Sequence, residues 1–330
     1  LQRAIEGFTN VRADDDESSL HCLNAYGQAL LRLGEHALGA GVYRRAHEVA
    51  LKAYGPADDS TLTLQGNLAV ALTSLNRNDE AANLHEQVLA ARESLAGTPS
   101  AHKLAITLMN LAMVRSARGE LQAARSHAER AWTLSQSMPA SDRRSGTMAH
   151  NYALVLDRIG SRVEAQRLMQ LALRSRLEAG EAWLAIESLA SLAASYFDVG
   201  RFEESDRRYR EALALSGMAL PPLHPLRAEL LRSWCRVLSV VGKPNEALAR
   251  CDDAIRLFAQ RRSDAQLDSD RTLVNRGLAL SALGRAPEAI NSLRDAVRGL
   301  TGHVPEHHPE LLEAKRALSV VLVDQGQLDE

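Results

Sequence analysis

Asparagine is the polar residue whose recurrence in this chain most suggests binding chemistry. Asn67, Asn110, Asn151 and Asn275 occupy the same phase of a repeating pattern, and Ser191 and Ser233 take that phase in between. A side-chain amide both donates and accepts hydrogen bonds, so a row of amides can bind a peptide backbone. Asparagine is an indifferent helix former, so its recurrence within helical patterns needs a reason. The alternative explanations for the recurring asparagine are a hydrogen bond between repeats and simple inheritance by repeat duplication.

Catalytic motifs are missing from the sequence. It contains no GxxxxGK[ST], GxSxG, HExxH, CxxC or GxGxxG pattern. His303, His307 and His308 form a cluster that we interpret as part of a solvated loop, with a metal site as the alternative. The acidic run from Asp14 to Glu17 lacks the glycine and the spacing of a calcium loop, and we expect it to cap the helix that follows. We predict no catalytic residue, no metal and no cofactor.

Three cysteines, Cys22, Cys235 and Cys251, have no metal-type spacing, and their number is odd. We therefore expect reduced thiols in a cytoplasmic protein. Cys235 and Cys251 occupy two packing positions of one repeat and could lie near each other. We interpret them as buried reduced thiols that act as small hydrophobic groups, with a redox pair as the alternative.

The elements that would position these residues are marked by a regular glycine. Gaps of 40 to 43 residues separate successive turn residues, which are Gly34, Asn76, Gly119, Gly160, Gly200, Gly242, Gly284 and Gly326. A fixed period of this size is typical of repeat architectures. On either side of Gly200, apolar residues recur at helical spacing, so the glycine separates two amphipathic helices. Glycine, or asparagine as its substitute, can take the left-handed conformation that lets the second helix fold back.

Small residues recur at fixed distances from each turn, which allows close packing of the two helices. Seven residues before the turn stand Gly27, Ala69, Ala112, Ala153, Ala193, Cys235, Gly277 and Ser319. Five residues after it stand Gly39, Ala81, Ala124, Ala165, Ser205, Ala247 and Ala289. The sequence therefore predicts an all-α fold of antiparallel helix pairs.

With these columns the chain resembles the tetratricopeptide repeat (TPR) family, as in LNRNDEAANLHEQVL and LGRAPEAINSLRDAV. The aromatic column is weak, since Tyr43 and Tyr209 fit but His85, Ala128 and Cys251 replace it elsewhere. The period of about 42 residues and segments such as YGPADDSTLTLQGNLAVAL resemble the kinesin-light-chain type, common in bacterial signalling proteins. The resemblance implies a right-handed superhelical α-solenoid.

The expected array spans residues 1–330. It comprises a lone second helix at 1–11, seven helix pairs over 18–300 and a lone first helix at 309–325. Because no polar capping helix is evident at either end, we expect an excerpt of a longer protein. The uncapped ends, with Leu312, Leu318 and Leu322, could also self-associate.

The resemblance further implies that the asparagine column lines a concave groove and hydrogen-bonds an extended peptide. Arginines in that groove favour a ligand with acidic residues or a free carboxylate, while Glu187, Glu229, Asp157 and Asp198 make the field mixed. The expected groove residues are Asn24, Asn67, Asn110, Asn151, Asn275, Arg158, Arg232, Arg236, His150, Met109 and Met113, with Gln28 and Arg32 beside them.

Composition narrows the partners further. The net charge is −2 and only 4% of residues are aromatic, which disfavours nucleic-acid binding. No apolar stretch is long enough for a membrane span. We therefore predict a scaffold that binds a protein or peptide, without catalysis in this chain. The alternative is the regulatory or sensor region of a larger bacterial signalling protein, such as a serine/threonine kinase or an ATPase-type regulator, with its catalytic domain elsewhere.

Overall fold

The computed structural model describes residues 17–94, 101–137, 145–260 and 266–326, and all regular structure within them is α-helical. The first helices of the repeats are α2 (Glu17–Arg32), α4 (Asp59–Ser74), α6 (Ala101–Ala117), α8 (Ser145–Ile159), α10 (Ala182–Asp198), α12 (Pro225–Val240), α14 (Gln266–Ala282) and α16 (Pro309–Asp324). The second helices are α3 (His36–Tyr54), α5 (Asn78–Ser94), α7 (Leu121–Ser137), α9 (Arg162–Glu178), α11 (Phe202–Ala219), α13 (Pro244–Ala259) and α15 (Ala286–Thr301).

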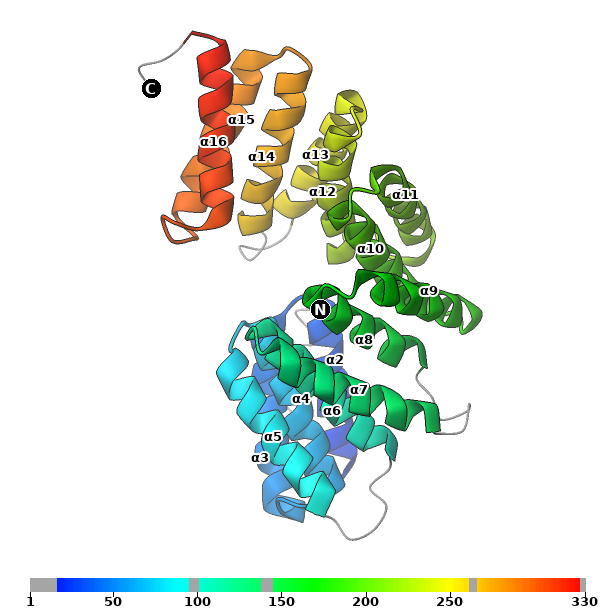
Figure 1. The fold of residues 1–330 in the computed structure, drawn as a ribbon. Helices are drawn as coiled ribbons and strands as arrows, with labels where there is room; N and C mark the ends of the chain where they lie inside the picture. Colours follow the sequence, from blue (N-terminus) through cyan, green and yellow to red (C-terminus); the bar gives the residue numbers. More distant parts are fainter. Residues whose placement is uncertain (1–16, 95–100, 138–144, 261–265, 327–330) are drawn as a thin grey trace. The chain divides into compact units, whose positions relative to one another are not determined.

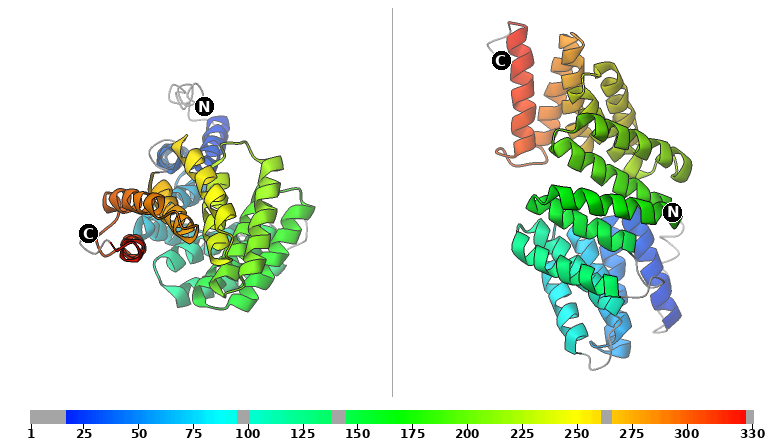
Figure 2. Two further views of the ribbon diagram at one scale, coloured as in Figure 1. Left: turned by 90° about the horizontal axis from the view of Figure 1, so that it is seen from above. Right: turned by 45° about the vertical axis from the view of Figure 1, so that its right-hand side comes forward.

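The chain divides into two compact units, residues 1–172 and residues 173–330. Within each unit, consecutive helices run antiparallel and pack side by side (Figures 1 and 2). First helices of successive repeats also contact one another, as α4 does α6 and as α12 does α14. The predicted all-α solenoid of helix pairs is confirmed. The lone helix expected at 1–11 and the acidic residues before Glu17 lie outside the described residues.

Every predicted turn residue has a positive φ. The glycines lie between 72° and 91°, and Asn76, at 58°, is the non-glycine residue in this region among those described. The residue after the turn donates its N–H to a carbonyl five positions back, as Arg201 does to Tyr196 at 2.9 Å and Arg77 to Leu72 at 2.9 Å. This is the hydrogen bond that closes a helix with a left-handed residue. The glycine interpretation is therefore confirmed.

Several first helices begin with a side-chain cap. Asp58 accepts hydrogen bonds from the N–H groups of Ser60 and Thr61 at 2.9 and 3.3 Å. His224 and His308 accept at Nδ1 from the N–H groups of Leu226 and Glu310, and each precedes a proline at the first helical position. His308 therefore caps α16, and His303 Nδ1 lies 2.8 Å from the carbonyl oxygen of Gly299. Among the described residues, no group of three metal-ligating side chains forms a metal site.

The position seven before the turn faces the position nine after it, and in two repeats a glycine at the first position faces a large side chain at the second. A Cβ added at Gly27 would lie 2.6 Å from the ring of Tyr43, and one added at Gly277 would lie 2.5 Å from Cγ of Leu293. Glycine thus makes room for a large partner on the opposite helix. This pairing joins the two helices of a repeat.

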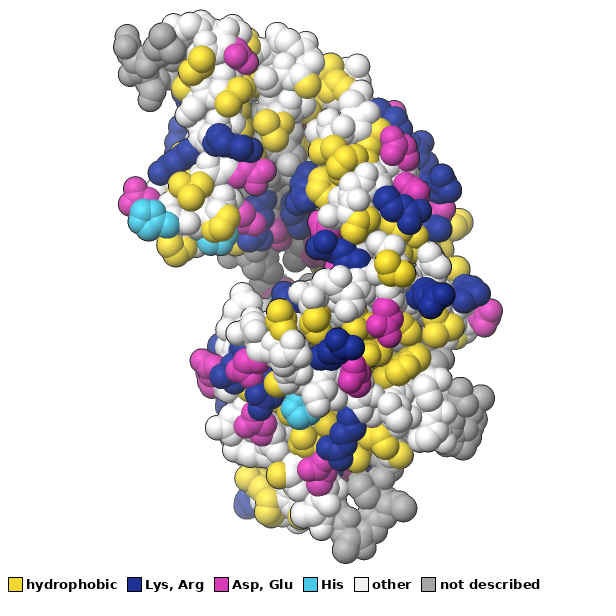
Figure 3. Space-filling view, viewed as in Figure 1, with side chains coloured by type: hydrophobic (Ala, Val, Ile, Leu, Met, Phe, Trp, Pro, Cys, Tyr) yellow, Lys and Arg dark blue, Asp and Glu magenta, His cyan; other side chains and the backbone are white. Residues whose placement is uncertain are grey.

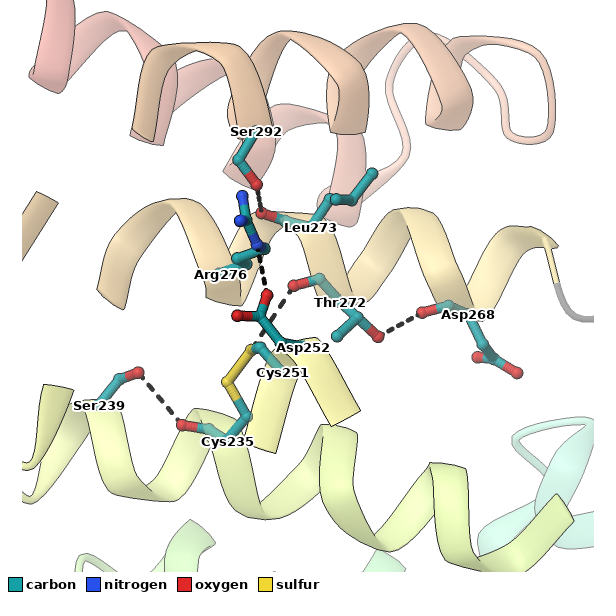
Figure 4. Close-up of a disulfide and its surroundings, with 9 residues drawn as sticks. All are labelled: Cys235, Ser239, Cys251, Asp252, Asp268, Thr272, Leu273, Arg276 and Ser292. Carbon is teal, nitrogen blue, oxygen red and sulfur yellow. Dashed lines mark hydrogen bonds and ion pairs between the residues drawn. A yellow bond between two sulfur atoms is a disulfide. The ribbon is translucent and has the colours of Figure 1, made fainter. Parts of the chain in front are cut away.

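Cys235 and Cys251 occupy this facing pair in the sixth repeat and form a disulfide (Figure 4). Their Cα atoms are 5.5 Å apart, within the range that a disulfide spans, and both residues are fully buried. The prediction of reduced thiols was wrong at this pair. Its error was to treat the two packing columns separately, when they face each other and bring the sulfur atoms into bonding range. Cys22 is free and exposed.

The helices also bear on two expectations about the surface. No helix in the described part of the chain is long and apolar enough to cross a membrane. On α16, Leu312 is half exposed, whereas Leu322 is only 6% exposed and belongs to the core of the second unit. The apolar face expected at this end is therefore narrower than the sequence indicated.

Candidate functional site

A cavity of about 320 Å³ in the first unit lies between α2, α4, α5 and α6. The amide side chains of Asn24, Asn67 and Asn110, which belong to three successive first helices, all line it. Two residues of the asparagine column, Asn67 and Asn110, therefore line one hollow together with Asn24, which lies one position earlier in its repeat. Asn67 donates through Nδ2 to Oδ1 of Asn24 at 2.8 Å, so at this pair the repeat-to-repeat hydrogen bond is realised. Gln28 also lines the cavity.

Other predicted groove residues of the first unit are engaged within the fold. Met109 is 1% exposed and belongs to the core, so it does not form the apolar surface for a ligand that the sequence suggested. Met113 is half-buried. Arg158 donates to the carbonyl oxygen of Ser116 at 2.9 Å. His150 is 5% exposed. Asn151, on α8, is half-buried and does not line the cavity that holds the other three asparagines.

A second cavity, of about 310 Å³, lies in the second unit between α10, α11, α12 and α14. Three predicted residues line it together, namely Arg232, Arg236 and Asn275. The guanidinium of Arg236 stacks over the ring of Phe197 at 4.3 Å from its centroid, an arrangement that leaves its edge free to bind. Asp198 also lines this cavity, so its charge is mixed as expected.

Buried arginines at one register position were missed by sequence reasoning. Arg92 donates to the carbonyl oxygen of Lys103 at 2.8 Å and to the hydroxyl of Thr107 at 2.6 Å. Arg176, 16 residues after its turn as Arg92 is, donates to the carbonyl oxygen of Leu184 at 2.8 Å and to Ser188 at 2.7 Å. Each arginine ties a second helix to the start of the next first helix. The sequence did carry a signal for this connection. An arginine stands 16 residues after the turn, and Thr or Ser stands at the partner position on the next first helix.

His85 was noticed only as a poor match to the aromatic column. It is 1% exposed and lines the cavity of the first unit, and neither ring nitrogen has a hydrogen-bond partner among the described residues. Burial, with the charge of Arg92 as the lesser cause, lowers the pKa of His85 to about 4. The imidazole is therefore neutral at physiological pH and keeps one donor and one acceptor unpaired.

Charges of both signs are interspersed on the surface. In Figure 3, Lys and Arg side chains alternate with Asp and Glu side chains on the visible face of each unit. Many form local ion pairs, such as Arg77 with Glu80 at 2.6 Å and Arg285 with Glu288 at 2.6 Å. A uniform basic surface of the kind that binds nucleic acid is not seen on this face.

Two family models, both described as tetratricopeptide repeat, match residues 22–94 and 186–226. The chain therefore contains tetratricopeptide repeats in these two segments. Tetratricopeptide repeat protein 19 homolog, mitochondrial, from Drosophila melanogaster is 26% identical over 147 residues, which cover 41% of this chain and 39% of that protein. The chain thus matches about two fifths of the length of this curated relative. The TPR matches support a protein-interaction scaffold as the class of protein.

Solved structures share the TPR fold at low identity. BtubC (BKLC) from P. vanneervenii has a TM-score of 0.60 at 18% identity, over 70% of this chain and 95% of its own. The apo form of the quorum sensor NprR from B. thuringiensis has a TM-score of 0.63 at 11% identity, over 95% of this chain and 96% of its own. At these identities the likeness concerns the fold alone.

Proposed function

We propose that this TPR chain is a protein-interaction scaffold that binds an extended peptide on the faces of its first helices, without catalysis. The observation that carries the proposal is the convergence of Asn24, Asn67 and Asn110 on one cavity of the first unit. Amides on three successive first helices thus line one hollow, where their remaining donors and acceptors can hydrogen-bond a peptide backbone. Asn110 makes no side-chain hydrogen bond within the described residues, so its amide is available to a ligand.

The second unit supplies a second peptide subsite in this proposal. Arg232, Arg236 and Asn275 line its cavity, and a guanidinium binds a carboxylate with paired donors. A peptide with acidic residues is therefore the expected ligand. Arg232 lies 3.9 Å from Asp268, a distance at which a ligand carboxylate can compete for the guanidinium.

The relatives are consistent with the proposal at the level of fold. NprR is a quorum sensor, and its likeness to this chain supports the general suitability of such helix pairs for ligand recognition. A regulatory region within a larger signalling protein would use the same binding surface. The two functions differ in what is joined to the array, which the sequence of the parent gene decides.

The test is a selection from a displayed library of random extended peptides, followed by affinity measurement with the Asn110→Ala and Asn275→Ala variants. Loss of one bidentate amide contact should weaken a selected peptide about fivefold or more, because a net hydrogen bond contributes about 1 kcal/mol. Asn291→Ala is the matched control, since Asn291 is exposed on the second helix α15 and lines neither cavity.

Helical circular dichroism of each variant controls for folding. If no peptide is enriched, or if the Asn110 and Asn275 variants bind selected peptides as tightly as the parent chain, the groove proposal is wrong.

A further inference from the structure

The cavity of the first unit is also lined by second-helix residues that the proposed amide row does not include. These residues are His85 and Arg92 of α5, and we call the part of the cavity that they line its inner end. Both are buried, at 1% and 5% exposure. Polar groups at such depth are normally paired, so their unpaired atoms require an explanation.

Three nitrogen atoms at this end have no partner among the described residues. They are Nδ1 and Nε2 of His85 and Nε of Arg92. The other nitrogens of Arg92 are occupied by Lys103, Thr107 and Thr63, which hold the guanidinium in place. The fixed guanidinium and the imidazole, whose residues line the cavity, therefore hold two enclosed N–H donors that the protein itself does not use.

The charge at this end is also incompletely balanced. Arg92 is ionised at all physiological pH values. The carboxylate that reaches it is Asp59, whose oxygen lies 3.9 Å away on a half-exposed side chain that also pairs with Lys103. No Asp or Glu is among the described residues that line this cavity, whereas Lys103 and His102 line its rim. A buried cation without a close counter-ion is costly, and an anionic ligand would relieve that cost.

We infer that the His85–Arg92 end of this cavity is an anion subsite that receives a carboxylate from the bound peptide, the side chain of an acidic residue. The carboxylate accepts hydrogen bonds from the Nε–H of Arg92 and from the N–H of neutral His85. Meanwhile Asn67 and Asn110 hold the adjoining backbone. This inference rests on the proposed peptide binding for the source of the carboxylate, but the subsite itself can be tested without any peptide.

The fourth repeat carries an arginine equivalent to Arg92, and comparing the two repeats shows which residue is particular to the first unit's cavity. Arg176 repeats the hydrogen bonds of Arg92, but Met169 stands at the register position of His85. The hydrogen bonds of the arginine alone therefore connect successive repeats and do not mark a binding site. The histidine, with its unpaired nitrogens, is particular to the first unit's cavity.

The experiment follows the imidazole of His85 by NMR in the full chain labelled with ¹⁵N-histidine, with the His85→Tyr variant used for assignment. Sodium acetate is titrated at constant ionic strength, with acetamide and inorganic phosphate in parallel. Acetate should shift the His85 ring signals saturably, and acetamide should not. Lys103→Gln should weaken acetate binding about fivefold, because a partly exposed charge contributes about 1 kcal/mol. Lys52→Gln, which removes an exposed charge elsewhere in the unit, should leave it unchanged.

Absence of a saturable shift with acetate, or an equal shift with acetamide, overturns the anion subsite. Tighter binding of phosphate than of acetate overturns carboxylate as the ligand. With peptides selected by the library, Glu→Gln replacement should weaken binding. If peptides bind but this replacement has no effect, the subsite assignment fails while the scaffold stands. If acetate binds but no peptide is selected, the scaffold fails and the anion site stands.

Discussion

At the scale of single residues, His85 stands where Tyr43 and Tyr209 stand in two other repeats. Tyr43 and Tyr209 fill this position in their own repeats and are 1% and 5% exposed. His85 keeps the burial but brings a titratable ring with unpaired nitrogens. The residue thus links the stability of its repeat to pH.

The folded chain leaves His85 neutral down to a pKa of about 4, whereas the unfolded chain protonates it near 6.5. The unfolded state then binds more protons, so stability should fall as pH drops from about 6.5 towards 4, by up to ~3 kcal/mol from this residue. His47 and His127, whose pKa values burial also lowers, act in the same direction.

His85→Tyr should therefore reduce, without abolishing, the acid destabilisation measured by urea unfolding across this pH range. The variant should fold, because a tyrosine at this position already faces an alanine in the fifth repeat, where Tyr209 faces Ala193. His85 likewise faces an alanine, Ala69. An unchanged pH dependence would mean that His85 is not buried in its neutral form.

At the scale of helices, a glycine on the first helix of a repeat makes room for a large side chain on the second helix. Gly277 faces Leu293, and Gly27 faces Tyr43. Gly277→Ala gains about 1 kcal/mol of helix propensity but forces a Cβ against Leu293, which costs about 1–3 kcal/mol. We expect net destabilisation in urea unfolding.

Combining Gly277→Ala with Leu293→Ala tests the pairing. Leu293→Ala alone should cost about 2–5 kcal/mol because it opens a cavity. In that background Gly277→Ala should become stabilising, since the clash is gone and the propensity gain remains. Additive effects of the two substitutions would show that the positions do not contact each other.

The disulfide of the sixth repeat occupies the same facing pair. A bridge across a sequence separation of 16 residues is expected to contribute about 3 kcal/mol by restricting the unfolded chain. The Cys235→Ala/Cys251→Ala variant should fold, because Ala112 and Ala128 occupy this pair in the third repeat. It should be less stable than the oxidised parent and indifferent to reductant, whereas the parent should lose stability on reduction. Equal stability of parent and variant would contradict a formed bridge.

At the scale of the whole molecule, each repeat packs on its neighbours, so stability should be distributed rather than shared by one core. We expect Gly277→Ala to raise hydrogen exchange in α14, α15 and the adjacent α13 and α16. The helices α2 to α7 of the first unit should keep their protection. Uniform loss of protection over both units would instead indicate that the chain unfolds as one cooperative body.

Much of this organisation was predictable. Turn glycines, small-residue columns and helical periodicity act through local backbone conformation, which neighbouring residues determine, so the helix pairs followed from the sequence. The asparagine column was also predictable, because repetition preserves phase. Its burial pattern was not: Met109 shares the column's neighbourhood but points into the core.

By itself, then, the sequence determined the period, the turns, the pairing of helices and the TPR family. Only the tertiary structure decided that Cys235 and Cys251 are joined, that Asn24 bonds to Asn67, and that His85 and Arg92 meet at one cavity. These contacts join residues on different helices. Their formation depends on how helix faces rotate against each other and on which neighbours are small enough to admit them. Such relations arise from packing between elements, which local periodicity does not specify.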